Sequence, residues 1–251
     1  MSQQRSRRNQ SHHRQRPAGP RAAGSDQESE RKQPKVTAEW IKLEGHFFHL
    51  VLTEDQCQQA ASYLQLLQKW NKKVNLTGIR SPEEAVRLHF LESFFAAKQL
   101  PSGYLRVVDV GSGAGFPGLA MKIVRPDLRV VLLDSRKKKV MFQKEVIRRL
   151  EIQHVSAYQL RLEEGAFFLR QAYVVCWRAL RLEGRDMEFL LANTPASCLF
   201  ACFQGMGERM ERALQGLDVT KVPIPCSQNR TLLLARRTRD RVPPSANLAE
   251  R

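Results

Sequence analysis

A glycine-rich loop is the part of this sequence that is best suited to bind a ligand. From Asp109 to Phe116 the residues are D-V-G-S-G-A-G-F, between a predicted strand and a predicted helix. Glycines at such a turn let the chain bend tightly and let a ligand approach the backbone. The next predicted strand ends at Asp134, 19 residues after Gly115. A carboxylate there can accept hydrogen bonds from ribose hydroxyls, so the pattern predicts a cofactor that contains a nucleoside.

Two classes of cofactor share this layout. A dinucleotide site typically uses the spacing G-x-G-x-x-G, with a pyrophosphate at the helix N-terminus. Here Gly111, Gly113 and Gly115 have the spacing G-x-G-x-G, and Asp109 precedes them. This form fits S-adenosylmethionine better, because a carboxylate such as Asp109 can attract its α-ammonium group directly or through water. A nicotinamide or flavin cofactor and a purely structural turn are the alternatives.

Strands and helices alternate around this loop. Short apolar runs predict seven strands, at residues 107–110, 129–133, 154–158, 173–177, 197–203, 219–224 and 231–235. Helices are expected from about 116 to 124 and from about 136 to 150. The alternation indicates an α/β fold with a mostly parallel seven-stranded sheet. The short link around 225–230 predicts that the last two strands form an antiparallel hairpin at one edge.

Helices are also expected before the sheet. Thr53 and Gln56 have the spacing of a capping box, and apolar residues recur after them at three- and four-residue steps. Ser81 followed by Pro82 predicts the start of another helix, which should run to about residue 98. The sheet therefore carries an N-terminal helical extension.

The composition divides the chain into four expected parts. Residues 1–36 hold nine Lys or Arg against three acidic residues and almost no aliphatic ones, so we expect a disordered basic tail. The helical extension covers 37–100, the domain with the sheet covers 101–238, and a flexible C-terminal tail covers 239–251. The first tail is either a solubilising extension or a non-specific RNA-binding arm.

The charge balance points to a polyanionic partner. Lys and Arg number 41 against 25 Asp and Glu, a formal net charge of +16, and the pI is about 10.1. Nucleic acid is favoured over an acidic membrane surface, because no basic amphipathic helix with bulky apolar anchors is evident. The apolar runs are far shorter than a membrane span, and no secretory signal is evident, so we expect a cytoplasmic protein that spans no membrane.

The cysteines predict neither a metal site nor disulfides. There are five, in irregular positions without a C-x-x-C pair: Cys57, Cys176, Cys198, Cys202 and Cys226. We expect free thiols in a reducing compartment and no bound metal.

Several further strings accompany the glycine loop. They are Lys69-Trp70-Asn71-Lys72, Asn75-Leu76-Thr77, Arg87-x-His89, Leu91-Glu92-Ser93, Leu132-Leu133-Asp134-Ser135, Lys138-Lys139-Val140, Arg161-x-Glu163-Glu164 and Arg178-Ala179. With them, roughly residues 50 to 236 resemble the RsmG family, also called GidB, of bacterial methyltransferases. The resemblance implies a Rossmann-like class I fold that depends on S-adenosylmethionine. It also implies methyl transfer to N7 of one guanine in 16S ribosomal RNA, near the decoding region.

The resemblance also implies roles for individual residues. Besides Asp109, the glycines and Asp134, it places Phe116, Leu162, Glu163 and Arg178 at cofactor-contact positions. It places Asn75, His89, Arg161 and Arg230 on the substrate side. The implied partner is 16S ribosomal RNA or the small ribosomal subunit, and we expect a monomer. Two strings depart from the family pattern: Glu92 stands where Asp is usual, and Gln204 stands where Lys is usual.

The chemistry of the acceptor is consistent with this interpretation. An exocyclic amine usually calls for an Asn/Asp-Pro-Pro-aromatic clamp after the fourth strand, and the chain has Cys176-Trp177-Arg178-Ala179 there. A pyrimidine C5 acceptor calls for a nucleophilic Cys, commonly beside Pro, and Cys176 lacks that neighbour. Guanine N7 has a lone pair and no proton to lose, so it needs no general base. Arg178, at the end of its strand, is the predicted catalytic residue, because its planar donors can orient a guanine edge or the methionine carboxylate.

Two rival functions remain open at this point. A small-molecule methyltransferase would share the cofactor loop but would not need so basic a surface. A non-catalytic RNA-binding protein would share the charge but would not need the intact glycines and Asp134.

Overall fold

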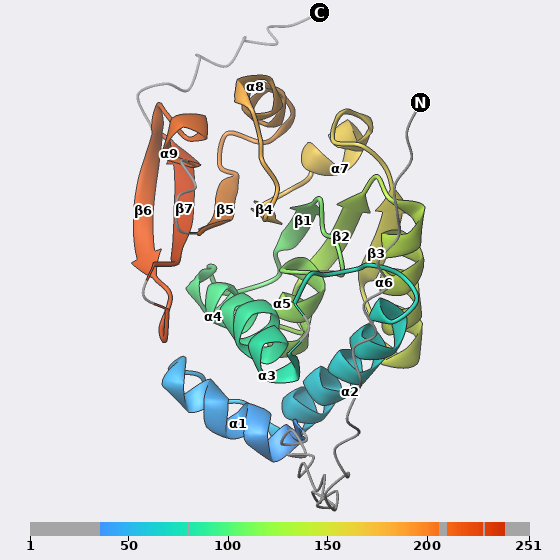
Figure 1. Cartoon of the computed structure of the whole chain (residues 1–251). Coiled ribbons are helices and arrows are strands. Elements are labelled where there is room, and N and C mark those ends of the chain that lie inside the picture. Colours follow the sequence, from blue (N-terminus) through green and yellow to red (C-terminus); the bar gives the residue numbers. More distant parts are fainter. Residues whose placement is uncertain (1–35, 80, 206–209, 228, 239–251) are drawn as a thin grey trace, which may run out of the picture. The chain divides into compact units, whose positions relative to one another are not determined.

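A seven-stranded sheet forms the centre of the structure (Figure 1). The computed structural model describes residues 36–79, 81–205, 210–227 and 229–238. The strands are β1 (Arg106–Val110), β2 (Arg129–Asp134), β3 (Val155–Gln159), β4 (Val174–Arg178), β5 (Leu199–Gln204), β6 (Leu217–Pro223) and β7 (Thr231–Arg237). Their order across the sheet is β3-β2-β1-β4-β5-β7-β6. All described pairings are parallel except those of β7, which runs antiparallel to both β5 and β6.

The predicted mostly parallel sheet and its edge hairpin are thus confirmed. The helices are α1 (Ala38–Phe47), α2 (Glu54–Asn71), α3 (Pro82–Ala85), α4 (Glu92–Gln99), α5 (Gly118–Val124), α6 (Lys137–Arg149), α7 (Ala166–Leu169), α8 (Gly184–Asn193) and α9 (Met210–Ala213). A π-helical segment, η1 (Val86–Leu91), joins α3 to α4, and a 3-10 turn, η2 (Glu163–Gly165), precedes α7. No described helix is long and apolar enough to cross a membrane.

The two faces of the sheet form two separate cores, because successive side chains of a strand point to opposite sides. Val107 and Cys176 belong to one core, which also holds residues of helices α1 to α6. Their chain neighbours Val108 and Val175 belong to the other core, with residues of α7, α8 and α9. Both faces of the central strands are therefore covered, and their carboxyl ends are left to form a site.

The helical extension begins with the capping residues that the sequence predicts. The Thr53 side chain accepts a hydrogen bond from the backbone N–H of Gln56, and the Gln56 side chain accepts one from that of Thr53. Ser81 caps α3, with Pro82 at its first position. The helix expected from there to about residue 98 is continuous to Gln99, but its second turn is the π-helix η1. The sequence did not predict α1, which Thr37 caps.

The expected tails lie outside the described residues, apart from Val36, where the described part of the compact unit begins. The division between a helical extension and a sheet domain at residue 100 stays a prediction. In the structure, α2 contacts both α5 and α6, so the extension packs directly on helices that flank the glycine loop.

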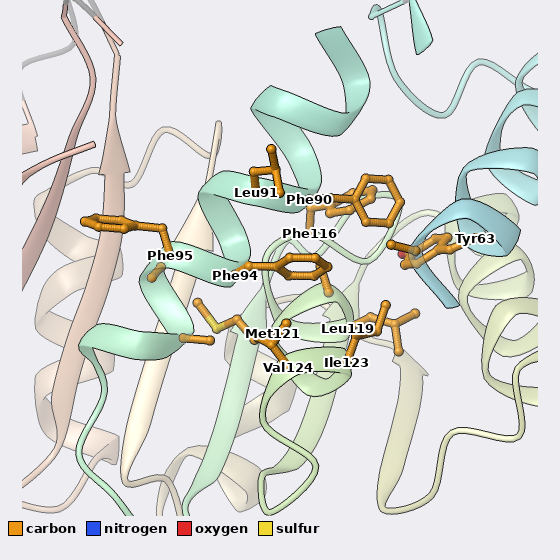
Figure 2. Packing of buried hydrophobic residues seen from close by; sticks show 14 of the residues in the cluster. Tyr63, Phe90, Leu91, Phe94, Phe95, Phe116, Leu119, Met121, Ile123 and Val124 are labelled. Atoms are coloured by element: carbon orange, nitrogen blue, oxygen red, sulfur yellow. The ribbon is translucent and has the colours of Figure 1, made fainter. Parts of the chain in front are cut away.

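Tyr63 of α2 also contacts the glycine loop itself. Its ring stacks on Phe116 at 5.2 Å between centroids and meets Phe90 edge-on at 5.1 Å, and Figure 2 shows it pointing toward both. Its hydroxyl donates a hydrogen bond of 2.5 Å to the backbone oxygen of Ala114, within the glycine loop. The side chain is fully buried, and burial raises the pKa of Tyr63 well above its usual value. The helical extension therefore packs against the glycine loop and bonds to its backbone.

We expect Tyr63→Phe to lower the free energy of unfolding by about 1–3 kcal/mol, because the buried Ala114 carbonyl loses its donor. Urea denaturation measures this loss. Tyr104→Phe is the matched control, since Tyr104 is 82% exposed and its change should stay within about 0.5 kcal/mol. Equal stability of both variants would show that the hydrogen bond between Tyr63 and the loop contributes nothing.

Candidate functional site

A cleft of about 370 Å³ lies at the carboxyl ends of the central strands. Its walls come from the ends of β1 and β2, from the segments 160–163 and 180–182, and from Asp186 of α8. Strand order reverses between β1 and β4, and ligands of open α/β sheets bind at such a point. The volume lies within the range of small-molecule sites.

The glycine loop forms one wall of this cleft through Gly111. Gly111, Gly113 and Gly115 have φ angles of +67°, +59° and +91°, a region that side chains rarely adopt. A Cβ atom at Gly111 would lie 2.9 Å from Cδ2 of Leu180, so the Leu180 side chain would have to shift, and the positive φ is the stronger reason for glycine here. The predicted use of glycine, tight turning and close approach, is what this backbone requires.

Asp134 holds the loop in place. Its Oδ2 accepts a hydrogen bond of 2.8 Å from the backbone N–H of Gly113, and its Oδ1 accepts one of 2.8 Å from Arg136 at the start of α6. A carboxylate oxygen has a second lone pair, so both oxygens can still accept a bond from a ligand in the cleft. Asp134 therefore combines a structural task with a free acceptor at the cleft wall.

Gln143 is a second support of the loop, which the sequence interpretation missed. Its Nε2 donates to Oγ of Ser112 at 2.8 Å and to the backbone oxygen of Gly113 at 2.7 Å, and the residue is fully buried. A signal was present, because Gln143 lies between Val140 and Val146 in the buried stripe of α6. A polar residue within such a stripe indicates a specific hydrogen-bond partner.

Asp109 lies beneath the loop and not among the residues that line the cleft. Its Oδ2 accepts a hydrogen bond of 2.7 Å from the backbone N–H of Gly118, which ties β1 to the start of α5. The carboxyl group is fully buried, which raises its pKa well above the usual value, and Asp134 adds to the shift. Its Oδ1 has no hydrogen-bond partner among the described residues. A direct or water-mediated contact with an ammonium group stays a prediction.

Phe116 packs between two other rings. It stacks on Tyr63 from one helix and on His89 from η1, at 4.7 Å between the centroids of Phe116 and His89. Nε2 of His89 lies 3.0 Å from Oγ1 of Thr77. Burial lowers the pKa of His89 to about 3, and Arg178 and Arg230 add to this, so the imidazole is neutral at pH 7. Both residues thus contribute to packing under the loop.

Arg178 belongs to a buried cluster of charges. Its Nη2 lies 3.0 Å from Oε2 of Glu92, and Nε of Arg230 lies 2.9 Å from Oε1 of the same carboxylate. The side chains of Arg178, Glu92 and Arg230 are 7%, 1% and 28% exposed. The guanidinium carbon of Arg178 is also 5.3 Å from the ring centroid of Phe203. Burial raises the pKa of Glu92, although both guanidinium groups act in the opposite direction.

From the sequence, Glu92 is only a departure from the usual Asp, and its pairing with two arginines is not predicted. A carboxylate between Leu91 and the buried Phe94 and Phe95 is the signal that could have found it. It joins residues from η1/α4, from the end of β4 and from the segment before β7. Glu92 therefore fixes the position of the predicted catalytic arginine.

The remaining predicted residues divide between two places. Arg161, Leu162 and Glu163 line the cleft, so the first of them, expected on the substrate side, lies at the predicted cofactor site. Asn75 is exposed and lines a different cavity, of about 290 Å³, beside Asn71 at the end of α2. Arg178 does not line the cleft, but Leu180, two residues further along, does.

The cysteines and acidic residues form no metal site in the described part of the chain, where no three His, Cys, Asp or Glu side chains come together. All five cysteines have free thiols. Cys176, at the carboxyl half of β4, is fully buried, and burial raises the pKa of its thiol well above the usual value. It therefore stays a protonated thiol, which is a poor nucleophile.

We expect Glu92→Gln to lower the free energy of unfolding by about 3 kcal/mol or more, because the buried Arg178 and the partly buried Arg230 both lose the charge of this carboxylate. Glu92→Asp keeps the charge and should lose less. Glu188→Gln, at an exposed position of α8, should change stability by less than about 0.5 kcal/mol. Denaturant unfolding of the three variants tests this, and a Glu92→Gln protein as stable as the wild type would contradict it.

Comparison with known proteins shows which family this chain matches. A family model described as rRNA small subunit methyltransferase G matches residues 56–203. Curated proteins named Ribosomal RNA small subunit methyltransferase G are 41% identical over 117 residues in Acetivibrio thermocellus and 45% identical over 115 residues in Vibrio cholerae. These matches cover 47% and 46% of this chain and 48% and 54% of the relatives. The chain thus spans about half the length of the curated relatives it matches.

Solved structures agree on the fold. MtNAS in complex with MTA and tNA has a TM-score of 0.51 at 18% identity, over 72% of this chain and 73% of that one. A point mutant of MtNAS in complex with S-adenosylmethionine has a TM-score of 0.51 at 16% identity, over 81% and 85%. At such identities the likeness shows the α/β architecture alone. Since the family model covers more than half of the chain, the protein belongs to the rRNA small subunit methyltransferase G family.

Proposed function

We propose that the cleft at the carboxyl edge of the sheet binds S-adenosylmethionine. The observation that carries the proposal is the pairing of Gly111 and Asp134 in one cleft, within a family named for methyl transfer. Gly111 leaves backbone accessible where a Cβ would press on the Leu180 side chain, and Asp134 retains acceptor capacity for ribose hydroxyls. Leu162, Leu180 and Leu182 supply apolar walls suited to an adenine ring. The residues present therefore fit this cofactor.

The proposed acceptor is N7 of a guanine in 16S ribosomal RNA, near the decoding region. The relatives are named for small-subunit ribosomal RNA, and the net charge of +16 suits a polyanion. When bound, S-adenosylmethionine supplies an electrophilic methyl group on a sulfonium. N7 attacks with a lone pair and releases no proton, so positioning is the main task of the protein.

Arg178 is the residue proposed to orient the target base. It offers several donors in one plane, and Glu92 with Phe203 holds that plane in place. Such an acceptor has no proton to lose, so it needs no base from the protein. His89 is neutral and Cys176 is a protonated thiol, and neither has to take up a proton in this reaction. A fixed cation without a base agrees with this chemistry.

The wider assignments are proposals of the same kind. We propose that Asn75 and Arg230 face the RNA and that Arg161 contacts it from the wall of the cleft. His89 would then act indirectly, by holding Phe116. A cytoplasmic monomer that acts on 16S ribosomal RNA or on the small subunit follows from the same family resemblance.

The decisive experiment maps N7-methylguanine in 16S ribosomal RNA by mass spectrometry, in cells with and without this protein. We expect one modified guanine to disappear when the protein is absent. Unchanged ribosomal RNA would leave the two rival functions, a small-molecule methyltransferase and a non-catalytic RNA-binding protein. Calorimetric titration with S-adenosylmethionine then separates these two.

We expect Gly111→Val to abolish binding of S-adenosylmethionine while the protein stays folded. The new side chain would enter the space that Leu180 and the ligand share, and its φ of +67° adds strain of about 1–3 kcal/mol. Gly78→Val is the control, because a Cβ there meets nothing within 4 Å. Calorimetric titration showing wild-type affinity for Gly111→Val would overturn the assignment of the cleft.

We expect Arg178→Ala to reduce methyl transfer at least tenfold, a loss of about 1.4 kcal/mol in transition-state stabilisation. Arg178→Lys should also be impaired, since a point charge does not replace a planar group of donors. Turnover and cofactor affinity are measured at a temperature at which all variants are folded. If Arg178→Ala keeps full turnover, the arginine has only its structural role beside Glu92.

A further inference from the structure

Another hollow lies at the C-terminal end of α2, apart from the cleft and from the cavity that Asn75 lines. It measures about 280 Å³ and is lined by Lys69, Trp70, Lys73 and Val74. Both lysines are exposed, and Trp70 is half-buried. None of these lining residues is acidic, so the hollow combines an apolar surface with a positively charged rim.

The ring of Trp70 is held rigidly. It packs against Phe142 of α6 at 5.6 Å between centroids and an interplanar angle of 58°, and Phe142 is fully buried. Trp70 differs from the other two tryptophans. Trp177 is buried within the sheet, and the ring of Trp40 lies 5.6 Å from the guanidinium carbon of Arg87. Trp70 therefore presents an aromatic surface that is supported from inside and accessible from the hollow.

The surroundings of this hollow are also basic. Lys72 follows on the same helix end, and Figure 1 shows that this end lies beside α6. Helix α6 also exposes Lys144, two residues after Phe142, which the Trp70 ring contacts. The cavity that Asn75 lines is adjacent in sequence, since Lys72 belongs to its wall.

We propose that the hollow is a binding subsite for single-stranded RNA, in which one base stacks on Trp70 while Lys69 and Lys73 contact flanking phosphates. This proposal rests on the proposed function and adds a docking point outside the cofactor cleft. Stacking on an aromatic ring together with phosphate-binding cations is how proteins hold unpaired nucleotides. A strand seated there would continue across the end of α2 toward Asn75.

Charge favours RNA over a protein partner at this place. Lysine is depleted at the centre of protein interfaces, whereas two lysines flank Trp70 here. The alternative is that Trp70 merely covers Phe142 and that the lysines are solvated. These alternatives predict different responses to a short RNA.

The test titrates the full-length protein with a single-stranded oligoadenylate and follows tryptophan fluorescence. Stacking should quench the emission of the wild type and of Trp40→Phe, and the quenching should be lost in Trp70→Phe. Residues 1–36 contain no tryptophan, so the signal reports on Trp40, Trp70 and Trp177. An unquenched wild type, or quenching that persists in Trp70→Phe, would overturn the proposal.

Affinity for a 16S ribosomal RNA fragment gives an independent readout. We expect Trp70→Ala to weaken binding about fivefold or more, because replacing a ring that stacks on a base by alanine typically causes a loss of at least this size. The pair Lys69→Gln and Lys73→Gln should lower the slope of log affinity against log salt by about 0.7 per lysine. Lys98→Gln, an exposed lysine of α4, is the control.

These results are separable from the proposed function. If the wild type methylates the RNA but the Trp70 and lysine variants bind it normally, the subsite is wrong and the activity stands. If the wild type methylates nothing, the fluorescence titration still decides whether Trp70 stacks on a base. Trp70→Ala also removes the contact with Phe142, so thermal unfolding checks that this variant is folded where its binding is measured. The lysine pair leaves that contact intact and serves for comparison.

Discussion

The stack of Tyr63, Phe116 and His89 is the interaction on which the rest of the site depends. Phe116 belongs to the glycine loop, and its two partners belong to the helical extension. Because the rings of Tyr63 and Phe116 are buried and the Tyr63 hydroxyl also bonds to Ala114, the loop cannot move without disturbing the extension. The same contact fixes α2 and η1 against the sheet. It thereby positions Asn75 and Trp70 at the end of α2, and Glu92 after η1.

Glu92 shows the cost of placing charge in such a core. Removing a carboxylate from water is expensive, and a buried ion pair is often less stabilising than apolar packing of similar volume. Here one carboxylate serves two arginines from distant segments, at 3.0 Å and 2.9 Å. The arrangement is therefore explained better by the orientation that it imposes on Arg178 than by stability alone. The longer Glu, where the family usually has Asp, keeps both contacts in this chain.

The sequence predicted what depends on local patterns. Apolar runs indicated the strands, and the spacing of Gly111, Gly115 and Asp134 indicated the cleft, since these features act within a few residues or along one strand–helix–strand unit. It could not reveal that Glu92 pairs with Arg178, because Glu92 is brought there only by the tertiary packing of α4, which contacts α5. It also could not decide which side of the loop Asp109 and Phe116 face, as both a ligand contact and a buried contact suit these residue types.

Helix α6 connects the cleft with the proposed RNA subsite. Its start is held by Asp134, through the backbone N–H of Arg136, and Phe142 lies six residues further along under Trp70. Six residues of α-helix span only about 9 Å, and the helix is anchored to the loop again by Gln143. A rigid element of this length leaves little freedom between the two places. A strand stacked on Trp70 would therefore approach the cleft in a preset orientation. Such positioning, and not acid–base chemistry, can supply the acceleration of methyl transfer.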